Sequence, residues 1–156
     1  PGAGTTVQIL VPAVSGEAPL APKRTAARTP WAGTGNVLLV DDEPTVRNVA
    51  SRMLRRMGFD VLIAETGEAA IARFAKSHGK IRCVLLDLTM PGVTGAQVFS
   101  ALKEIDPKVP VVIATGFTET DIEDQIPGGA IAGTIIKPYE RQRLETCLRQ
   151  ALGELT

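Results

Sequence analysis

Runs of apolar residues alternate with amphipathic stretches from residue 36 to the end of the chain. Five of the runs are rich in Val, Leu and Ile and are nearly free of polar residues. This composition is typical of strands that are buried on both faces of a parallel sheet. The pattern therefore predicts strands over residues 37–40, 61–64, 81–87, 109–114 and 134–136.

Between these runs, apolar residues recur at spacings of three and four, as on the buried face of a helix. Pro44 suits the first turn of one such helix and Gly58 suits its end. Helices are predicted over 44–57, 66–76, 96–105 and 140–152, with a short, polar one over 118–125. In the first helix the inward residues are predicted to be Val46, Val49, Ala50, Met53, Leu54 and Met57. Alternating strands and helices predict an α/β fold, with five parallel strands joined by right-handed crossovers and covered on both faces.

Residues 1–35 have a different composition, with five of the 11 prolines and five of the 15 glycines. Residues 13–35 show no strand or helix period and are predicted to be a Pro/Ala-rich linker. A short β-prone run, Thr5 to Val11, precedes it. Composition alone favours a tail for that run. The chain begins at Pro1 without a Met, so we expect it to be part of a longer protein.

Charge and cysteine content narrow the class of protein. Seventeen basic and 17 acidic side chains cancel, so neither nucleic-acid binding nor direct membrane contact is expected. No apolar run approaches the ~20 residues that span a bilayer, and no signal peptide is recognised. Cys83 and Cys147 lie in predicted core positions, which favours reduced core thiols and a cytoplasmic location.

Polar side chains with reactive groups follow four of the five predicted strands. Asp41 and Asp42 follow the first strand, Asp87 ends the third, Thr115 follows the fourth and Lys137 follows the fifth. In open α/β sheets ligands bind beyond the carboxyl ends of the strands, where these side chains are expected to gather.

Three carboxylates at one edge repel each other unless a cation lies between them, and oxygen ligands of this kind suit Mg²⁺. A carboxylate can also attack phosphorus and form an aspartyl phosphate. Lys137 can balance the added negative charge, the Thr115 hydroxyl can donate to a phosphoryl oxygen, and Gly116 leaves room for a donor. The set predicts a carboxylate that accepts a phosphoryl group.

Each residue also has an ordinary structural explanation. Asp41 and Asp42 can cap the helix that begins near Pro44, and Asp87 can be a turn residue before Pro91. His78, the only histidine, is predicted to be exposed and without a role. The joint occurrence of the polar residues at four strand ends favours the functional interpretation.

These motifs resemble the receiver domain of two-component response regulators. The resemblance covers about residues 36–152 and rests on the segments 37–44, 85–95, 114–116 and 137–139. It implies a doubly wound, CheY-like sheet with strand order 2-1-3-4-5 and helices on both faces.

The resemblance also implies roles for the site residues. Asp87 would be the phosphoacceptor, and Mg²⁺ would be held by Asp42, Asp87 and the Thr89 backbone carbonyl, assisted by Asp41 through water. Thr115 and Gly116 would form the switch and phosphate-binding loop, and Lys137 would pair with the phosphate. The peptide bond before Pro138 would be cis.

Thr134 departs from the family pattern, which places Tyr or Phe three residues before the lysine. Readout is then expected to pass through the Thr115 loop and the following helix. An alternative is a receiver that acts as a docking element or phosphate sink. A phosphohydrolase is disfavoured, because such enzymes generally have a second Asp where Thr89 stands.

Residues 2–12 resemble the last strand of a histidine-kinase ATP-binding domain. This implies that residues 1–12 are a remnant of that domain, 13–35 a linker and 36–156 the receiver. The parent would be a hybrid sensor histidine kinase, either anchored in a membrane or not. The phosphodonor and partner would be a histidine kinase or a histidine phosphotransfer protein.

Overall fold

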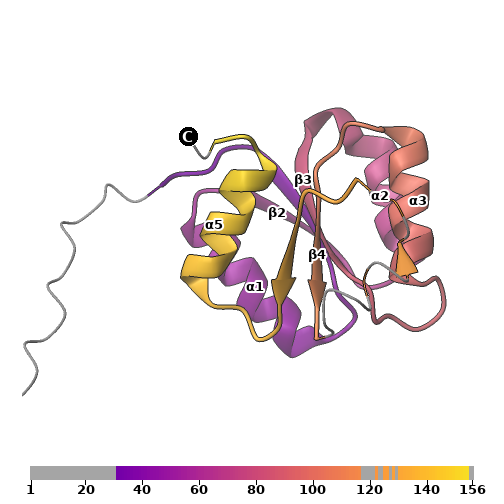
Figure 1. Cartoon of the computed structure of the whole chain (residues 1–156), viewed down its shortest axis with the longest axis horizontal. Helices are drawn as coiled ribbons and strands as arrows, with labels where there is room; N and C mark the ends of the chain where they lie inside the picture. The colour runs from indigo at the N-terminus through magenta and orange to yellow at the C-terminus, as the bar shows by residue number, and fades with distance from the viewer. Residues whose placement is uncertain (1–30, 117–121, 123–124, 127, 129, 155–156) are drawn as a thin grey trace, which may run out of the picture.

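The predicted strands form one parallel sheet in the order β2-β1-β3-β4-β5, which confirms the predicted fold (Figure 1). The computed structural model describes residues 31–116, 122, 125–126, 128 and 130–154. The strands are β1 (Asn36–Val40), β2 (Asp60–Ala64), β3 (Ile81–Asp87), β4 (Val111–Thr115) and β5 (Gly133–Ile136). The helices are α1 (Pro44–Arg56), α2 (Gly67–Ser77), α3 (Gly95–Ile105) and α5 (Arg141–Ala151), with a 3₁₀ turn at His78–Lys80.

Helices cover both faces of the sheet, with α1 and α5 on one face and α2 and α3 on the other (Figure 1). Each strand places alternate side chains on opposite faces, so the sheet contributes to two cores. Leu38, Val84 and Leu86 pack with the α2–α3 layer, whereas Val37 and Leu85 pack with the α1–α5 layer. This double burial explains why the strands are apolar almost throughout.

The parallel register brings the carboxyl ends of the central strands together. Val40 pairs with Leu86, and Asp87 pairs with Ala114. Residues that follow β1 therefore lie beside the end of β3, although they are far from it in sequence. Thr115 pairs with Ile136, which places the residue after β5 at the same edge.

Helix α1 is rotated relative to the predicted stripe. Val49 was expected to face the core, but it is 43% exposed, so that prediction is wrong. The buried positions include Arg47 and Ser51, which share a face with Ala50 and Leu54. In this orientation the Arg47 guanidinium reaches the loop before the helix.

The predicted helix over 118–125 lies largely outside the described residues. Of the described positions near it, Ile122 and Ile126 are buried in the α2–α3 core. The Ile126 amide donates to the Ile122 carbonyl at 2.9 Å. The run Thr5 to Val11 and nearly all of the predicted linker also lie outside the described residues.

Both cysteines are free and buried, as their sequence positions suggested. Burial raises the pKa of Cys83 to about 12, so the thiol is protonated at neutral pH. Among the helices that the structure describes, none has the length and apolar character needed to cross a membrane.

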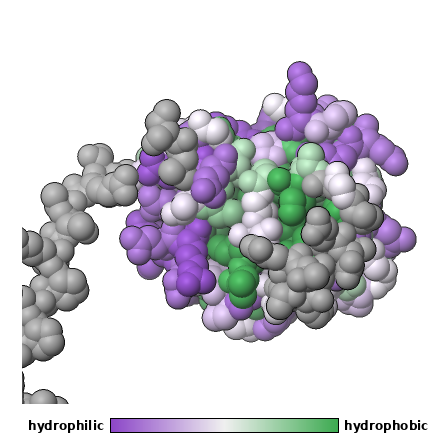
Figure 2. Space-filling view, viewed as in Figure 1, coloured by the Kyte–Doolittle hydropathy of each residue, from purple (hydrophilic) through white to green (hydrophobic). Residues whose placement is uncertain are grey.

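The apolar surface on the β5 side of the sheet is visible in Figure 2, where it lies between the polar surface of α5 and the helices of the other layer. β5 is an edge strand that pairs only with β4 within the described part of the chain. Ile136, at its end, is 53% exposed.

The segment Trp31 to Gly35 packs against the amino-terminal edge of the sheet, upstream of β1. The Trp31 ring meets the Phe59 ring edge-on with centroids 5.4 Å apart, and the indole N–H donates to Glu154 at 2.8 Å. Gly33 donates to the Met57 carbonyl, and a Cβ at Gly33 would overlap the Phe59 ring. The two ends of the described chain thus lie side by side (Figure 1), and the folded unit begins upstream of Asn36.

Replacing Trp31 by Ala is expected to lower the free energy of unfolding by about 2 kcal/mol, because a partly buried ring and its aromatic contact are lost. The change is measured by urea unfolding followed by circular dichroism. Tryptophan fluorescence is unsuitable, because the substitution removes the only tryptophan of the chain. Glu154→Gln is the control. It removes the charge that pairs with Arg82 but keeps a side-chain oxygen that can accept from the Trp31 indole, and it should cost less than about 1 kcal/mol. An unchanged urea midpoint for Trp31→Ala would show that the segment adds no stability.

Candidate functional site

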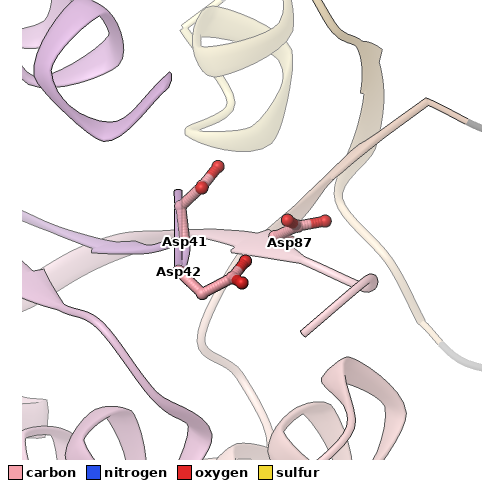
Figure 3. A group of neighbouring side chains, drawn as sticks. All are labelled: Asp41, Asp42 and Asp87. Carbon is pink, nitrogen blue, oxygen red and sulfur yellow. The ribbon is translucent and has the colours of Figure 1, made fainter. Parts of the chain in front are cut away.

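Three carboxylates gather at the carboxyl edge of the sheet. Asp41 and Asp42 follow β1, and Asp87 is the last residue of β3 (Figure 3). Each offers an oxygen within 4.8 Å of the others. Asp41 and Asp87 are 0% and 4% exposed, whereas Asp42 is more exposed. The arrangement concentrates negative charge at the mouth of a buried site.

Lys137 brings positive charge to this cluster from the end of β5. Its Nζ donates to Asp87 Oδ2 at 2.7 Å and lies 2.7 Å from Asp41 Oδ2, the latter as an ion pair without the geometry of a hydrogen bond. Burial opposes the charged form, but Asp41 and Asp87 outweigh it and raise the pKa of Lys137. The ammonium is therefore charged at neutral pH and bridges two strand ends.

The remaining oxygens of the two buried carboxylates accept backbone amides. Asp41 Oδ1 accepts from Glu43, and Asp87 Oδ1 accepts from Thr89, each at 2.9 Å. The N-cap residue of α1 is Glu43, whose side chain makes no cap hydrogen bond. Helix capping therefore does not account for Asp42, and the turn interpretation accounts for only one oxygen of Asp87.

A cleft of about 500 Å³ opens beside the carboxylates. Its lining comprises Asp42, Glu43, Pro44, Asp87, Thr89, Gly116 and Lys137. Thr115 ends β4 and is fully buried, and its carbonyl accepts the Lys137 amide at 2.9 Å. The Lys137–Pro138 peptide bond is cis. The structure thus gathers every site residue predicted from the sequence at one edge of the sheet.

Sequence reasoning missed two residues that contact this site. Arg47 donates to the backbone carbonyls of Asp41 and Asp42. Tyr139 is buried beside the carboxylates. Burial, and then the charges of Asp41 and Asp87, raise the pKa of its phenol well above the usual value. The sequence did contain a signal for Arg47. It is a charged residue that lies three and seven positions before Ala50 and Leu54, which is the spacing of one helix face.

Thr134 lies at the edge of the sheet, at the position where the family pattern places an aromatic residue. It lines a cavity of about 550 Å³ between β5 and α5. The Cys147 thiol lies 3.8 Å from its backbone carbonyl. An aromatic side chain is thus replaced by a small hydroxyl beside an open groove.

The model of the response regulator receiver domain matches residues 37–149. The chain belongs to this family. It is a receiver domain of two-component signalling, with the CheY-like topology described above.

The curated relatives that resemble this chain are longer proteins. It is 28% identical to the sensor kinase CckA of Brucella abortus over 158 residues, which cover 97% of this chain and 17% of CckA. It is 32% identical to the probable transcriptional regulator ycf27 of Porphyridium aerugineum, covering 74% of this chain and 47% of that protein. The chain therefore spans less than half the length of these two relatives.

Solved receiver structures share the fold. The N-terminal domain of a response regulator/sensory box/GGDEF 3-domain protein from Carboxydothermus hydrogenoformans is 30% identical, with a TM-score of 0.67 over 76% of this chain and 94% of that one. The receiver domain of the sensor histidine kinase PA1611 from Pseudomonas aeruginosa PAO1 is 21% identical, with a TM-score of 0.70 over 78% and 99%. That structure has a magnesium ion coordinated in its active site cleft.

Proposed function

We propose that this receiver accepts a phosphoryl group on Asp87 from a phosphohistidine donor. The carrying observation is the position of Asp87. It ends a central strand, faces a cleft of about 500 Å³, and lies 2.7 Å from the Lys137 ammonium and close to two further carboxylates. An Asp87 oxygen forms the new bond to phosphorus as the donor's P–N bond breaks and its electron pair returns to the imidazole.

The donor set fits Mg²⁺, which prefers hard oxygen ligands and is typically bound by one or two carboxylates plus phosphate oxygens. Asp42, Asp87 and the Thr89 backbone carbonyl would hold the ion, with Asp41 assisting through water. Bound there, Mg²⁺ supplies positive charge against the phosphoryl oxygens. Asp41 is fully buried and does not line the cleft, whereas Asp42 and Asp87 do, which supports an indirect role for Asp41.

The other site residues balance charge and orient the group. The Lys137 ammonium would neutralise charge on the phosphoryl oxygens, and its pairing with Asp87 keeps the ammonium in position. The Thr115 hydroxyl donates to a phosphoryl oxygen after transfer, and Gly116 leaves space for the donor. Water then cleaves the acyl phosphate and restores the Asp87 carboxylate.

Removing the divalent cation tests this proposal directly. Acetyl phosphate and Mg²⁺ are expected to add one phosphoryl group to the wild-type chain, detected by intact mass. With excess EDTA the addition should fall to background, because the single Lys137 charge does not offset three carboxylates that repel the incoming phosphate dianion. If the wild type gained no phosphoryl group with Mg²⁺, or gained it equally with EDTA, the proposal would fail.

The parent protein is proposed to be a hybrid sensor histidine kinase. The match to CckA covers 97% of this chain, so it includes most of residues 1–35 as well as the receiver. This supports assigning residues 1–12 to the end of an ATP-binding domain and residues 13–35 to a linker, whose last residues, from Trp31 on, pack against the receiver. The partner would be a histidine kinase or a histidine phosphotransfer protein in the cytoplasm.

Thr134 supports a second candidate, a receiver that serves as a docking element or phosphate sink. The groove beside it is lined by α5 residues in place of an aromatic side chain that could rotate. Beryllofluoride, which mimics the phosphoryl group, separates the two functions. A change in affinity for a phosphotransfer partner supports signalling, and an unchanged affinity supports the sink.

A further inference from the structure

We propose that Arg47 is a positioning residue for Mg²⁺ binding. It would set the affinity of the loop that carries Asp41 and Asp42, here called the acidic loop. The inference rests on the proposed function, since it assumes that Asp42 and Asp87 bind the cation. It concerns a residue that does not itself contact the cleft. Arg47 acts on the backbone that carries Asp41 and Asp42.

The Arg47 guanidinium spans two loops at the carboxyl edge of the sheet. Nη1 donates to the Asp41 carbonyl at 2.8 Å and to the Asp42 carbonyl at 3.0 Å. Nη2 donates to Glu65 Oε1 at 3.1 Å, just beyond β2. The Arg47 side chain is only 10% exposed, whereas that of Glu65 is 67% exposed. The hydrogen bonds of Arg47 to the acidic loop are therefore better shielded from water than its ion pair with Glu65.

The Asp41 and Asp42 carbonyls belong to the two residues after β1, where the backbone is no longer held by strand pairing. The Asp41 amide still donates to Ala64, but α1 begins three residues later, with no side-chain cap hydrogen bond from Glu43. Charge-assisted hydrogen bonds from a planar guanidinium are strong and directional. Arg47 therefore orders the turn from which the Asp42 side chain leaves the backbone.

Arg47 differs from Lys137 in what it leaves available. Lys137 pairs with the Asp41 and Asp87 carboxylates, so it competes with a cation for oxygen atoms. Arg47 pairs with carbonyls of the loop and leaves the carboxylate of Asp42 open to the cleft. Arg47 thus orients the Asp42 side chain without using its carboxylate oxygens.

The sign of the mutational effect separates positioning from simple electrostatics. The guanidinium charge repels a nearby cation, so its removal alone would tighten Mg²⁺ binding. Loss of loop order would weaken binding instead. Changes to groups that orient metal ligands typically cost 10–100-fold in metal affinity. We expect the Mg²⁺ dissociation constant of Arg47→Met to rise about tenfold.

Arg82→Met is the matched control. Arg82 also donates from one guanidinium to a backbone carbonyl, that of Thr34, and to a glutamate, Glu154. It lies at the opposite edge of the sheet. Its replacement should lower the urea midpoint and leave the Mg²⁺ dissociation constant unchanged.

The experiment is calorimetric titration of the unphosphorylated chain with MgCl₂, with circular dichroism to verify folding. Arg47→Lys keeps the charge but not the fork, and should weaken binding severalfold; it decides the question if Arg47→Met does not fold. Unchanged or tighter binding by a folded Arg47 variant would overturn the inference. Absence of Mg²⁺ binding by the wild type would instead overturn the proposed function.

Discussion

Asp87→Asn is expected to abolish phosphoryl addition from acetyl phosphate, reducing it to the background measured with EDTA. An amide oxygen is a far weaker nucleophile than a carboxylate, so the new bond to phosphorus does not form. The variant also loses one carboxylate of the three-aspartate cluster, and one of the two proposed to hold the cation directly. Intact mass spectrometry over a time course measures the effect.

Asp60→Asn is the control for this experiment. Asp60 begins β2 at the opposite edge of the sheet, and its side chain is exposed. The same loss of one negative charge there should leave the extent and rate of phosphoryl addition unchanged. Addition to Asp87→Asn at the wild-type level would locate the acceptor elsewhere in the chain.

Gly95→Ala is expected to destabilise the fold by about 3 kcal/mol or more, because the added methyl group overpacks rigid backbone. A Cβ at Gly95 would lie 2.4 Å from the Leu88 Cα and 2.5 Å from the Asp87 carbonyl oxygen. Neither atom can rotate away, so α3 must move relative to the end of β3. That movement would also displace Asp87 and the following turn.

Urea unfolding followed by circular dichroism measures this change, and MgCl₂ titration reports the displacement of the site. Gly79→Ala is the control, because a Cβ there meets nothing within 4 Å and its φ is not positive. It should change stability by less than about 1 kcal/mol. A Gly95→Ala variant as stable as Gly79→Ala would mean that α3 adjusts without cost.

The fold and the location of the site were largely predictable because both depend on local patterns. Buried parallel strands must be apolar on both faces, so β1, β3 and β4 stand out within a few residues of their observed bounds. The polar residues at their ends cannot be explained as core, which marked the carboxyl edge as the candidate site before any contact was known.

The rotation of α1 was less predictable. Apolar periodicity alone placed Val49 inward, yet the helix buries Arg47 and Ser51 and exposes Val49. The pattern counts hydrophobic residues and contains no information on polar groups that a buried side chain can satisfy elsewhere. The Asp41 and Asp42 carbonyls are such groups, and they become partners of Arg47 only once the loop has folded.

The start of the folded unit also depends on contacts between residues that are distant in sequence. Trp31 lies in a stretch without strand or helix period, where a linker was predicted. Its contacts are with Phe59 and Glu154, the latter 123 residues further along the chain. No window of neighbouring residues contains such a pair.

The sequence by itself determined the α/β class, the strand positions and the chemical character of the carboxyl edge, because burial on two faces and helix periodicity act over a few residues. Tertiary structure decided which groups meet there. Lys137 reaches Asp87 across 50 residues, and Arg47 reaches the loop that carries Asp42. These pairings depend on strand register and helix rotation, which arise only when the two cores pack together.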